Sequence, residues 1–305
     1  MDRVLKLGTR ASPLALAQAN QAAAALAAVH GWDGQQIEIV TVTTTGDRVQ
    51  DRPLAEIGGK ALWTKELDRA LSDGSVDFCV HSMKDVESER PATLRIASIL
   101  PRADVRDRLI GADSIAALRS GAVIGTSSPR RSAQLLRLRP DLAIVAFRGN
   151  VQTRIDKVAA GEVDATVLAA AGLDRLGLEI GAAVSTETML PAPGQAAIGI
   201  ECRSDDDQLI ALIEAASHGP SHACVTAERA FTRALGGSCA SPVAALATMD
   251  GAELLLRCAL YSADGLDCIT DEARVHPGDD HVPEEMARAM LGRASRSIRI
   301  LFEDS

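Results

Sequence analysis

The chain has 305 residues, of which 47% are hydrophobic and 24% charged; this balance is typical of globular proteins and excludes intrinsic disorder as the main state. The length fits two or three domains of about 100–150 residues. A formal net charge of −9 makes general nucleic-acid binding a poor prediction, although the 32 basic side chains can still form local sites for small anions.

Short apolar runs alternate with helical patterns along the first two thirds of the chain. The predicted strands are residues 4–7, 37–42, 76–80, 94–99, 123–125, 143–147, 165–168 and 197–201. The predicted helices are residues 13–29, 61–71, 114–119, 129–138, 151–160 and 206–216. This alternation predicts an α/β fold with parallel sheets that carry helices on both faces.

The pattern changes after residue 217. A predicted helix at 221–235 is followed by strand-like runs at 243–249, 253–261 and 269–275, and by a final helix at 283–297. Closely spaced strands with no helix between them favour a mostly antiparallel sheet, so we expect a C-terminal α+β module. The stretch 189–194 is rich in Pro and Gly and is typical of a crossover or hinge.

The cysteines and the apolar stretches indicate the compartment. None of the six cysteines forms a C-x-x-C pair, and no N-x-S/T glycosylation site occurs. Residues 11–32 carry no charged side chain, but their apolar residues are mostly Ala. We interpret this stretch as an amphipathic helix rather than a membrane span or an export signal. We therefore expect free thiols, a cytoplasmic location and no membrane association.

Arginine side chains follow three of the predicted strands, at the points where helices begin. Arg10 follows the first strand, Arg130 and Arg131 follow strand 123–125, and Arg148 and Arg154 follow strand 143–147. A positive side chain near a helix N-terminus is unfavourable for the helix dipole unless an anion lies nearby. Ligands of open α/β sheets bind at the carboxyl ends of the strands. The three junctions together predict a site for a polyanion.

Other polar residues at these junctions have a structural interpretation. Ser12, Ser128 and Asn150 are suited to be helix N-caps. Lys84 and Asp85 follow strand 76–80 and form either a surface ion pair or a functional pair. In the functional reading, Lys84 binds an anion while Asp85 stabilises a developing cation or transfers a proton.

Three other sequence features are weak indications of nucleotide, metal or thiol chemistry. Gly-Gly before Lys60 lacks the remaining residues of a nucleotide P-loop, and no G-x-G-x-x-G occurs. His218, His222 and Cys224 lack a fourth ligand nearby, so we favour a solvated linker there and expect no metal site. Cys239 lies in a Gly/Ser/Pro loop; its residue type and setting leave open an inert core thiol or an exposed, reactive one.

A series of motifs resembles one enzyme family. The motifs are T-R-x-S-P-L-A-L, G-G-K-x-L-[FW]-x-K-E-L, V-H-S-M-K-D, G-T-S-S-x-R-R, R-G-N-V-x-T-R, A-G-L-x-R-L-G-L, L-P-A-x-G-Q-x-A-x-G-I-E-C-R and V-T-A-E-R-A before a Gly-flanked Cys. In order and spacing, from about residue 4 to residue 242, they resemble porphobilinogen deaminase (hydroxymethylbilane synthase).

The resemblance implies a fold and a reaction. The expected fold is two periplasmic-binding-protein-like α/β domains with a central cleft, plus a C-terminal α+β domain with a three-stranded sheet. The expected limits are residues 1–98 with 197–216, then 99–196, then 217–305. The implied enzyme is a monomer that joins four porphobilinogen molecules head to tail, releasing ammonia each time, on a covalently bound dipyrromethane cofactor. Water then releases the linear tetrapyrrole.

The resemblance also implies roles for individual residues. Cys239 matches the residue that bears the cofactor, and Asp85 matches the catalytic aspartate. The residues that match positions around the cofactor carboxylates are Lys84, Thr126, Ser127, Ser128, Arg130 and Arg131. Those that match contacts on the substrate side are Arg10, Ser12, Arg148, Arg154 and Arg175, with Lys60 on a flexible loop over the cleft. The sequence departs from the family pattern at several positions: Ala61 and Ala196 replace Gly, Trp63 replaces Phe, Glu87 replaces Pro, Glu56 stands where some members have Lys, and the loop of Cys239 reads Gly-Gly-Ser-Cys in place of Gly-Gly-Cys.

Two other classes of protein compete with this interpretation. A non-catalytic anion-binding protein of the periplasmic-binding type would share the fold and explain the arginines, but it gives no reason for Cys239 in an open loop. A cysteine-dependent acyl transferase needs a base for the thiol, and the sequence cannot bring His81 to Cys239.

Overall fold

The computed structural model describes residues 3–43, 64–236 and 241–303. The chain divides into two compact units. Unit 1 comprises Met1–Ala103 and Ala196–Val225, and unit 2 comprises Asp104–Gln195 and Thr226–Ser305. Within the described residues, no helix is both long enough and apolar enough to cross a membrane.

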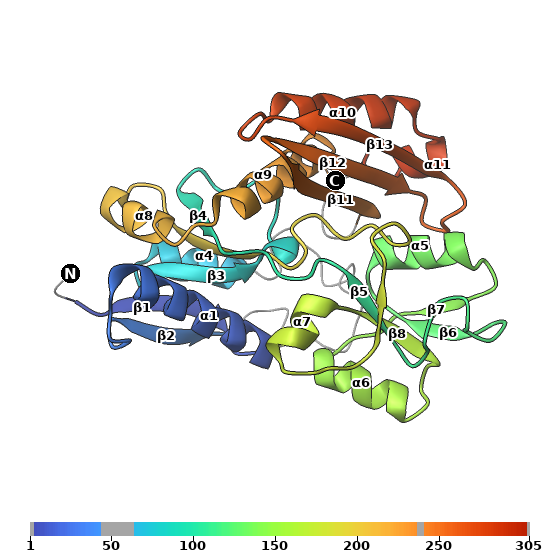
Figure 1. Cartoon of the computed structure of the whole chain (residues 1–305), viewed down its shortest axis with the longest axis horizontal. Coiled ribbons are helices and arrows are strands. Elements are labelled where there is room, and N and C mark those ends of the chain that lie inside the picture. The colour runs from blue at the N-terminus through green and yellow to red at the C-terminus, as the bar shows by residue number, and fades with distance from the viewer. Residues whose placement is uncertain (1–2, 44–63, 237–240, 304–305) are drawn as a thin grey trace. The chain divides into compact units, whose positions relative to one another are not determined.

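Unit 1 is built on a five-stranded mixed sheet with the strand order β2-β1-β3-β10-β4 (Figure 1). Its strands are β1 (Leu5–Arg10), β2 (Ile37–Val42), β3 (Phe78–Ser82), β4 (Leu94–Ile99) and β10 (Ile198–Arg203). Strand β1 runs parallel to β2 and β3, whereas β10 is antiparallel to both β3 and β4. The prediction of a parallel sheet is therefore wrong for β10. The chain enters β10 from unit 2, so no crossover helix within this sheet forces a parallel direction.

Helices cover both faces of this sheet. Helices α1 (Pro13–His30) and α8 (Asp207–Glu214) share one apolar core with the sheet, and α4 (Lys65–Ser72) packs on the other face. Small Ala side chains on α1, fully buried, let the helix approach the sheet closely. The predicted helix at 61–71 begins outside the described residues.

Unit 2 contains a second five-stranded mixed sheet, with the order β7-β6-β8-β5-β9. Its strands are β5 (Asp107–Ile110), β6 (Val123–Gly125), β7 (Ala143–Val145), β8 (Ala165–Ala169) and β9 (Ala182–Val184). Strand β6 is parallel to β7 and β8, and β5 is antiparallel to β8 and β9. The sequence did not predict β5 or β9, so the expected parallel sheet is again a mixed one.

Three helices pack on the sheet of unit 2: α5 (Pro129–Leu138), α6 (Val151–Ala159) and α7 (Ala170–Arg175). The helix predicted at 114–119 is wrong, because these residues form turns and bends. Ile115 and Leu118 still pack into the core, and their carbonyl groups accept hydrogen bonds from Arg139 Nη1, both at 3.1 Å. The guanidinium thus satisfies backbone acceptors that would otherwise favour a helix.

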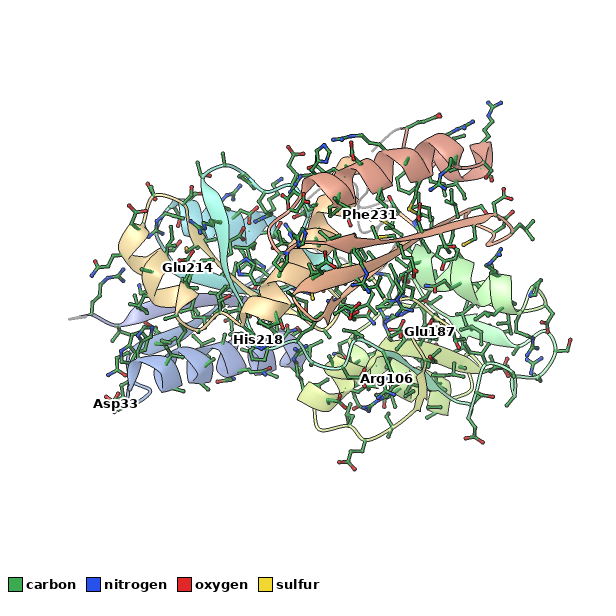
Figure 2. All side chains as sticks on the ribbon, turned by 45° about the horizontal axis from the view of Figure 1, so that its top comes forward. Asp33, Arg106, Glu187, Glu214, His218 and Phe231 are labelled. Carbon is green, nitrogen blue, oxygen red and sulfur yellow. The ribbon has the colours of Figure 1, made fainter. Side chains whose placement is uncertain are left out.

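The C-terminal part follows helix α9 (Gly219–Ala234), whose Phe231 is fully buried (Figure 2). Strands β11 (Val243–Asp250), β12 (Glu253–Tyr261) and β13 (Cys268–Val275) form an antiparallel three-stranded sheet. Helix α10 (His281–Arg293) packs along β13, and the short helix α11 (Arg296–Arg299) follows (Figure 1). The predicted fold class, two α/β sheets with helices and a C-terminal three-stranded α+β module, is confirmed.

Helix α5 lies between two sheets of unit 2. One side contributes Leu135 to the core of the five-stranded sheet. The other side contributes Ala133 to a small cluster with Ala244 and Ala259 of the C-terminal sheet. The loop at the start of α5 is therefore supported from both sides.

Candidate functional site

In unit 1, the predicted site residues gather at the carboxyl ends of two neighbouring parallel strands. Arg10 ends β1, and the 3₁₀ turn η1 (Met83–Asp85), which contains Lys84, directly follows β3. Arg10 and Asp85 line the same pocket. Ser12 caps α1 beside them, accepting a hydrogen bond from Ala15 N at 3.3 Å, as predicted.

Most of the residues that line this pocket are polar, and a hydrogen bond joins two of them. The remaining lining residues are Ala15, Gln18, Thr64, Val80, His81, Ser82 and Val86. Gln18 Nε2 donates to Ser82 Oγ at 2.7 Å, which ties α1 to the end of β3. This bond fixes the backbone from which η1 and Asp85 start.

A buried group of charges lies behind the pocket, and the sequence analysis missed it. Glu201 of β10 is fully buried, and its Oε2 lies 3.0 Å from His81 Nε2. Arg90 donates to both oxygens of Glu201, from Nε at 2.8 Å and from Nη2 at 2.9 Å. Burial alone would raise the pKa of Glu201, but His81 and Arg90 outweigh it and lower the pKa to about 2. A Glu inside the apolar run 197–201 was the signal that could have revealed this group.

In unit 2, the predicted residues again follow parallel strands that end at one edge of a sheet. The loop after β6 carries residues 126–128 and leads into the first turn of α5, which carries Arg130 and Arg131; the loop after β7 carries Arg148, and α7, which follows β8, ends at Arg175. Because β7, β6 and β8 are adjacent and parallel, these three segments begin at the same edge.

The hydroxyl groups of the loop after β6 shape its backbone. Ser127 Oγ donates to Phe147 O and accepts from Phe147 N, both at 3.0 Å, so it joins this loop to the one after β7. Ser128 caps α5 by accepting from Arg131 N at 3.4 Å, as predicted, and Thr126 Oγ1 accepts from Ser128 N at 3.2 Å.

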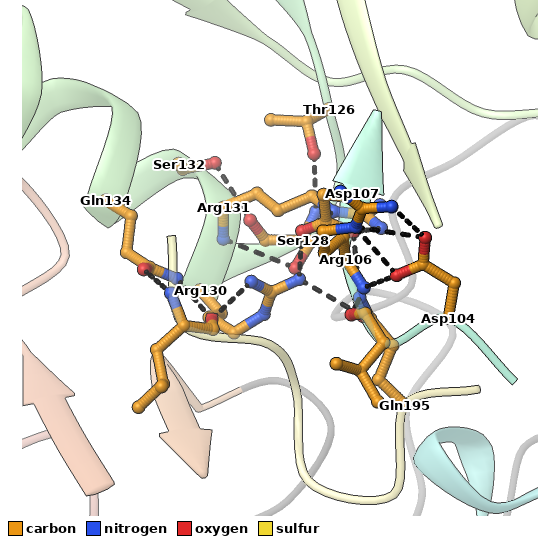
Figure 3. A network of polar contacts seen from close by, with 12 residues as sticks. Asp104, Arg106, Asp107, Thr126, Ser128, Arg130, Arg131, Ser132, Gln134 and Gln195 are labelled. Atoms are coloured by element: carbon orange, nitrogen blue, oxygen red, sulfur yellow. Dashed lines mark hydrogen bonds and ion pairs between the residues drawn. The ribbon is translucent and has the colours of Figure 1, made fainter. Parts of the chain in front are cut away.

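Arg130 and Arg131 are buried and share one carboxylate partner (Figure 3). Asp107 Oδ2 accepts from Arg130 Nη2 at 2.9 Å, and Asp107 Oδ1 accepts from Arg131 Nη2 at 2.7 Å. Arg130 Nη1 also donates to Leu190 O at 2.7 Å. Both arginines were predicted from the sequence, whereas Asp107 was not, because the local pattern around Asp107 predicts no strand.

Three further arginines lie near the same edge. Arg154 Nε donates to Gly149 O at 3.0 Å, which orients this side chain toward the turn after Arg148. Arg148 and Arg154 are both half-buried. Burial lowers the pKa of Arg175, while Asp174 opposes the shift.

The predicted site residues therefore form two groups, one in each unit. Arg10, Ser12, Lys84 and Asp85 belong to unit 1, and the serine and arginine loops belong to unit 2. Lys60 and Cys239 lie outside the described residues, as do Ala61 and Trp63.

Comparison with known proteins identifies the family. Residues 5–211 match the family model described as porphobilinogen deaminase, dipyromethane cofactor binding domain, and residues 222–291 match porphobilinogen deaminase, C-terminal domain. The chain belongs to the porphobilinogen deaminase family. The porphobilinogen deaminase of Sphingopyxis alaskensis is 54% identical over 99% of this chain and 97% of that protein. The porphobilinogen deaminase of Paracoccus denitrificans is 48% identical over 95% of this chain and 94% of that protein.

Membership of the porphobilinogen deaminase family decides between the classes that the sequence left open. The chain is an enzyme of this family, and the non-catalytic anion-binding protein is set aside. Among solved structures, the BvgS periplasmic VFT2 domain of Bordetella pertussis has a TM-score of 0.40 at 18% identity, over 70% of this chain and 86% of that chain. So low a score adds nothing to the assignment.

The residues of unit 2 fit the dipyrromethane cofactor that the porphobilinogen deaminase family carries. Its acetate and propionate arms are carboxylates, which guanidinium groups bind well. Arg130 Nε is buried and makes no hydrogen bond among the described residues. Two buried guanidinium groups against one carboxylate also leave a positive charge for an acidic arm to offset.

Proposed function

We propose that this chain polymerises four porphobilinogen molecules head to tail, with loss of ammonia, and releases hydroxymethylbilane by hydrolysis. The observation that carries this proposal is the match of both family domains, over residues 5–211 and 222–291. The cofactor, attached as a thioether at Cys239, supplies the pyrrole chain end on which the polymer grows.

The basic side chains bind the acidic arms of the cofactor and of the growing chain. Each added ring brings two carboxylates, so the number of acidic groups rises with every step. In this proposal, Lys84, Arg130 and Arg131, with the hydroxyls of Thr126, Ser127 and Ser128, hold the cofactor. The substrate contacts are Arg10, Ser12, Lys60, Arg148, Arg154 and Arg175. Guanidinium groups suit this task because they bind carboxylates with two parallel hydrogen bonds.

Asp85 is the catalytic residue in this proposal. Its half-buried carboxylate shares a pocket with Arg10, and among the described residues no other carboxylate lines that pocket. There it can accept hydrogen bonds from pyrrole N–H groups, offset positive charge that develops during condensation, and hold the proton that is lost when two rings join.

The intact mass of the purified chain tests the cofactor. We expect an excess equal to two linked pyrrole units, and the same mass without excess in Cys239→Ser. Cys268→Ser is the matched control, since Cys268 is a half-buried thiol on β13, and it should keep the excess. An adduct that survives in Cys239→Ser would move the attachment to another residue.

Turnover of Asp85→Asn tests the catalytic role. The variant should fold and carry the cofactor but lose nearly all hydroxymethylbilane formation, whereas Asp33→Asn at an exposed position should behave as the unaltered chain. Near-normal turnover in Asp85→Asn would contradict the role.

We also propose a monomeric, cytoplasmic enzyme with three domains: residues 1–98 with 197–216, residues 99–196, and residues 217–305 carrying Cys239. Buried free thiols at Cys79, Cys202 and Cys258 support a reducing compartment. Light scattering after gel filtration tests the monomer, cell fractionation tests the compartment, and limited proteolysis near residues 98, 196 and 217 tests the domain limits.

A further inference from the structure

The carboxylate of Asp107 is completely engaged by the two arginines and one amide (Figure 3). Asp107 begins β5 and is 1% exposed. Its Oδ1 accepts from Arg131 Nη2 at 2.7 Å and from Gln195 Nε2 at 3.0 Å. Its Oδ2 accepts from Arg130 Nη2 at 2.9 Å and from Arg131 Nε at 3.3 Å. With both oxygens occupied, Asp107 has no free acceptor for a ligand and acts only through the arginines.

The charges of this group do not balance. Burial alone would raise the pKa of Asp107, but Arg131 and Arg130 outweigh it and hold the pKa well below its usual range. Asp107 is therefore negative at neutral pH. Burial lowers the pKa of Arg130, and the like charge of Arg131 adds to this effect against the opposing Asp107. Two guanidinium groups meeting one carboxylate keep an excess positive charge.

Gln195 locks the carboxylate in this position. It is fully buried, its Nε2 also donates to Val105 O at 2.7 Å, and its Oε1 lies 3.4 Å from Arg130 Nη2. Gln195 therefore joins Asp107, Arg130 and the backbone before β5. Gln195 belongs to the L-P-A-x-G-Q motif, and these contacts give that position of the motif a structural role.

The donors that remain on the two arginines are few. Arg131 uses Nε and Nη2 on Asp107, and Nη1 makes no hydrogen bond among the described residues. Arg130 uses Nη1 on Leu190 O and Nη2 on Asp107, and only Nε is without a partner in the described part of the chain. Each guanidinium group thus keeps one nitrogen without a partner among the described residues, while Asp107 holds another of its nitrogens in place.

We propose that Asp107, fixed by Gln195, is a positioning residue that holds Arg130 and Arg131 side by side to bind a carboxylate arm of the dipyrromethane. The proposal rests on the proposed function. Without the carboxylate, the two guanidinium groups repel each other, and Arg131, which lies nearer the surface, turns away from its partner. The two guanidinium groups are then no longer held in the single arrangement that binds the carboxylate arm.

Cofactor incorporation measures this role directly. Full-length chains purified without cofactor are incubated with porphobilinogen, and intact mass follows the fraction that gains two pyrrole units. We expect Asp107→Asn to load about tenfold more slowly or worse, as for the loss of a hydrogen-bonded charged partner. Asp107→Glu restores the negative charge and should recover part of the rate.

Two variants separate positioning from general stability. Asp164→Asn is the control, because Asp164, like Asp107, accepts from arginine through both oxygens, although from the single arginine Arg119, at 3.0 and 2.7 Å. It lies at the amino end of β6, bonded to Val123 N, whereas Arg131 lies beyond the carboxyl end. This control should load at the unaltered rate. Gln195→Met keeps the volume and all charges but removes the amide bonds, and it should load more slowly than the control.

The outcomes are distinct. Loading of Asp107→Asn at the unaltered rate overturns the proposal. If Asp107→Asn shows no cooperative thermal transition and so does not fold, the test depends on Gln195→Met. Cofactor incorporation by Gln195→Met at the unaltered rate then overturns the proposal too. Equal slowing in Asp164→Asn would also overturn it, since a general loss of stability would then explain the effect. Failure of the unaltered chain to gain two pyrrole units would instead refute the proposed function.

Discussion

Replacement of Glu201 by Gln removes the negative charge that lies behind the pocket of Asp85. Glu201 is fully buried, 3.0 Å from His81 Nε2, and bound by Arg90 through two nitrogens at 2.8 and 2.9 Å. The substitution keeps the shape of the side chain but exchanges a charged acceptor for a neutral amide. Arg90 keeps its contacts to Asp68 and Glu87, so it is not left without an anion.

The size of the effect follows from the pKa of Glu201. The pKa falls from an ordinary 4.5 to about 2, a difference of about 2.5. At about 1.4 kcal/mol for each unit, the ionised carboxylate contributes about 3 kcal/mol to the free energy of unfolding. Because the folded pKa is lowered, this stability is complete above pH 4.5 and declines as the pH falls toward 2. At pH 3.5 about 2 kcal/mol should remain.

Urea unfolding followed by tryptophan fluorescence measures this difference. Trp32 packs against the core of unit 1, the unit that contains Glu201, so the signal reports the relevant part of the chain. We expect the free energy of unfolding of Glu201→Gln to be about 3 kcal/mol lower than that of the unaltered chain at pH 7. We expect this difference between the two chains to be smaller at pH 3.5.

The control is Glu214→Gln at the end of α8 (Figure 2). Glu214 pairs with Arg95, but both side chains are about half exposed, so its loss should cost at most about 1 kcal/mol. A gap for Glu201→Gln that stays below about 1 kcal/mol at pH 7, or that is the same at pH 7 and pH 3.5, would refute the reasoning.

Three further predictions concern single sites. Ala196 has a left-handed φ of 69°, a backbone conformation that strains a residue with a β-carbon. Ala196→Gly should therefore leave the free energy of unfolding nearly unchanged, whereas Ala211→Gly inside α8 should lower it by about 1 kcal/mol in the same urea experiment. Equal losses in the two variants would argue against strain at Ala196. A Cβ on Gly125 would lie 2.5 Å from Phe147 Cγ, so Gly125→Ala should lower the melting temperature and cost about 1–3 kcal/mol; an unchanged melting curve would show that the ring moves freely. Arg154→Ala should raise KM or stall chain growth without loss of cofactor, and unaltered elongation kinetics would remove Arg154 from the site.

Much of the fold follows from local patterns in the sequence. Ser12 and Ser128, each followed by Pro, predicted the starts of α1 and α5, because a hydroxyl acceptor and a fixed φ favour a helix start whatever its surroundings. The junctions of Arg10 and Arg131 were found for the same reason. Each lies where an apolar run gives way to a helical pattern, and that boundary is visible in a few residues.

The rest depended on contacts between distant residues. Strand β5 begins with Asp107 and Arg108, two charged residues that are typical of a loop. Asp107 can be buried in a strand because Arg130 and Arg131, which are distant in the sequence, pair with its carboxylate. Glu201 was overlooked for the same reason, since its partners come from other parts of unit 1. The direction of β10 likewise depends on the path of the chain through the fold and not on its own apolar pattern.

The position of α5 between two sheets restricts which parts of the chain can be exchanged with those of a relative. Gly265, with a φ of 73°, sits so close to Ala133 O that any β-carbon there would collide with it, and Ala133 also touches Ala244 and Ala259. In a chimera whose C-terminal sheet comes from a relative, the face of α5 that packs on this sheet must keep the same small side chains. Larger side chains on one of these surfaces would displace the first turn of α5, which carries Arg130 and Arg131. Natural substitutions on α5 and on the C-terminal sheet should therefore be correlated.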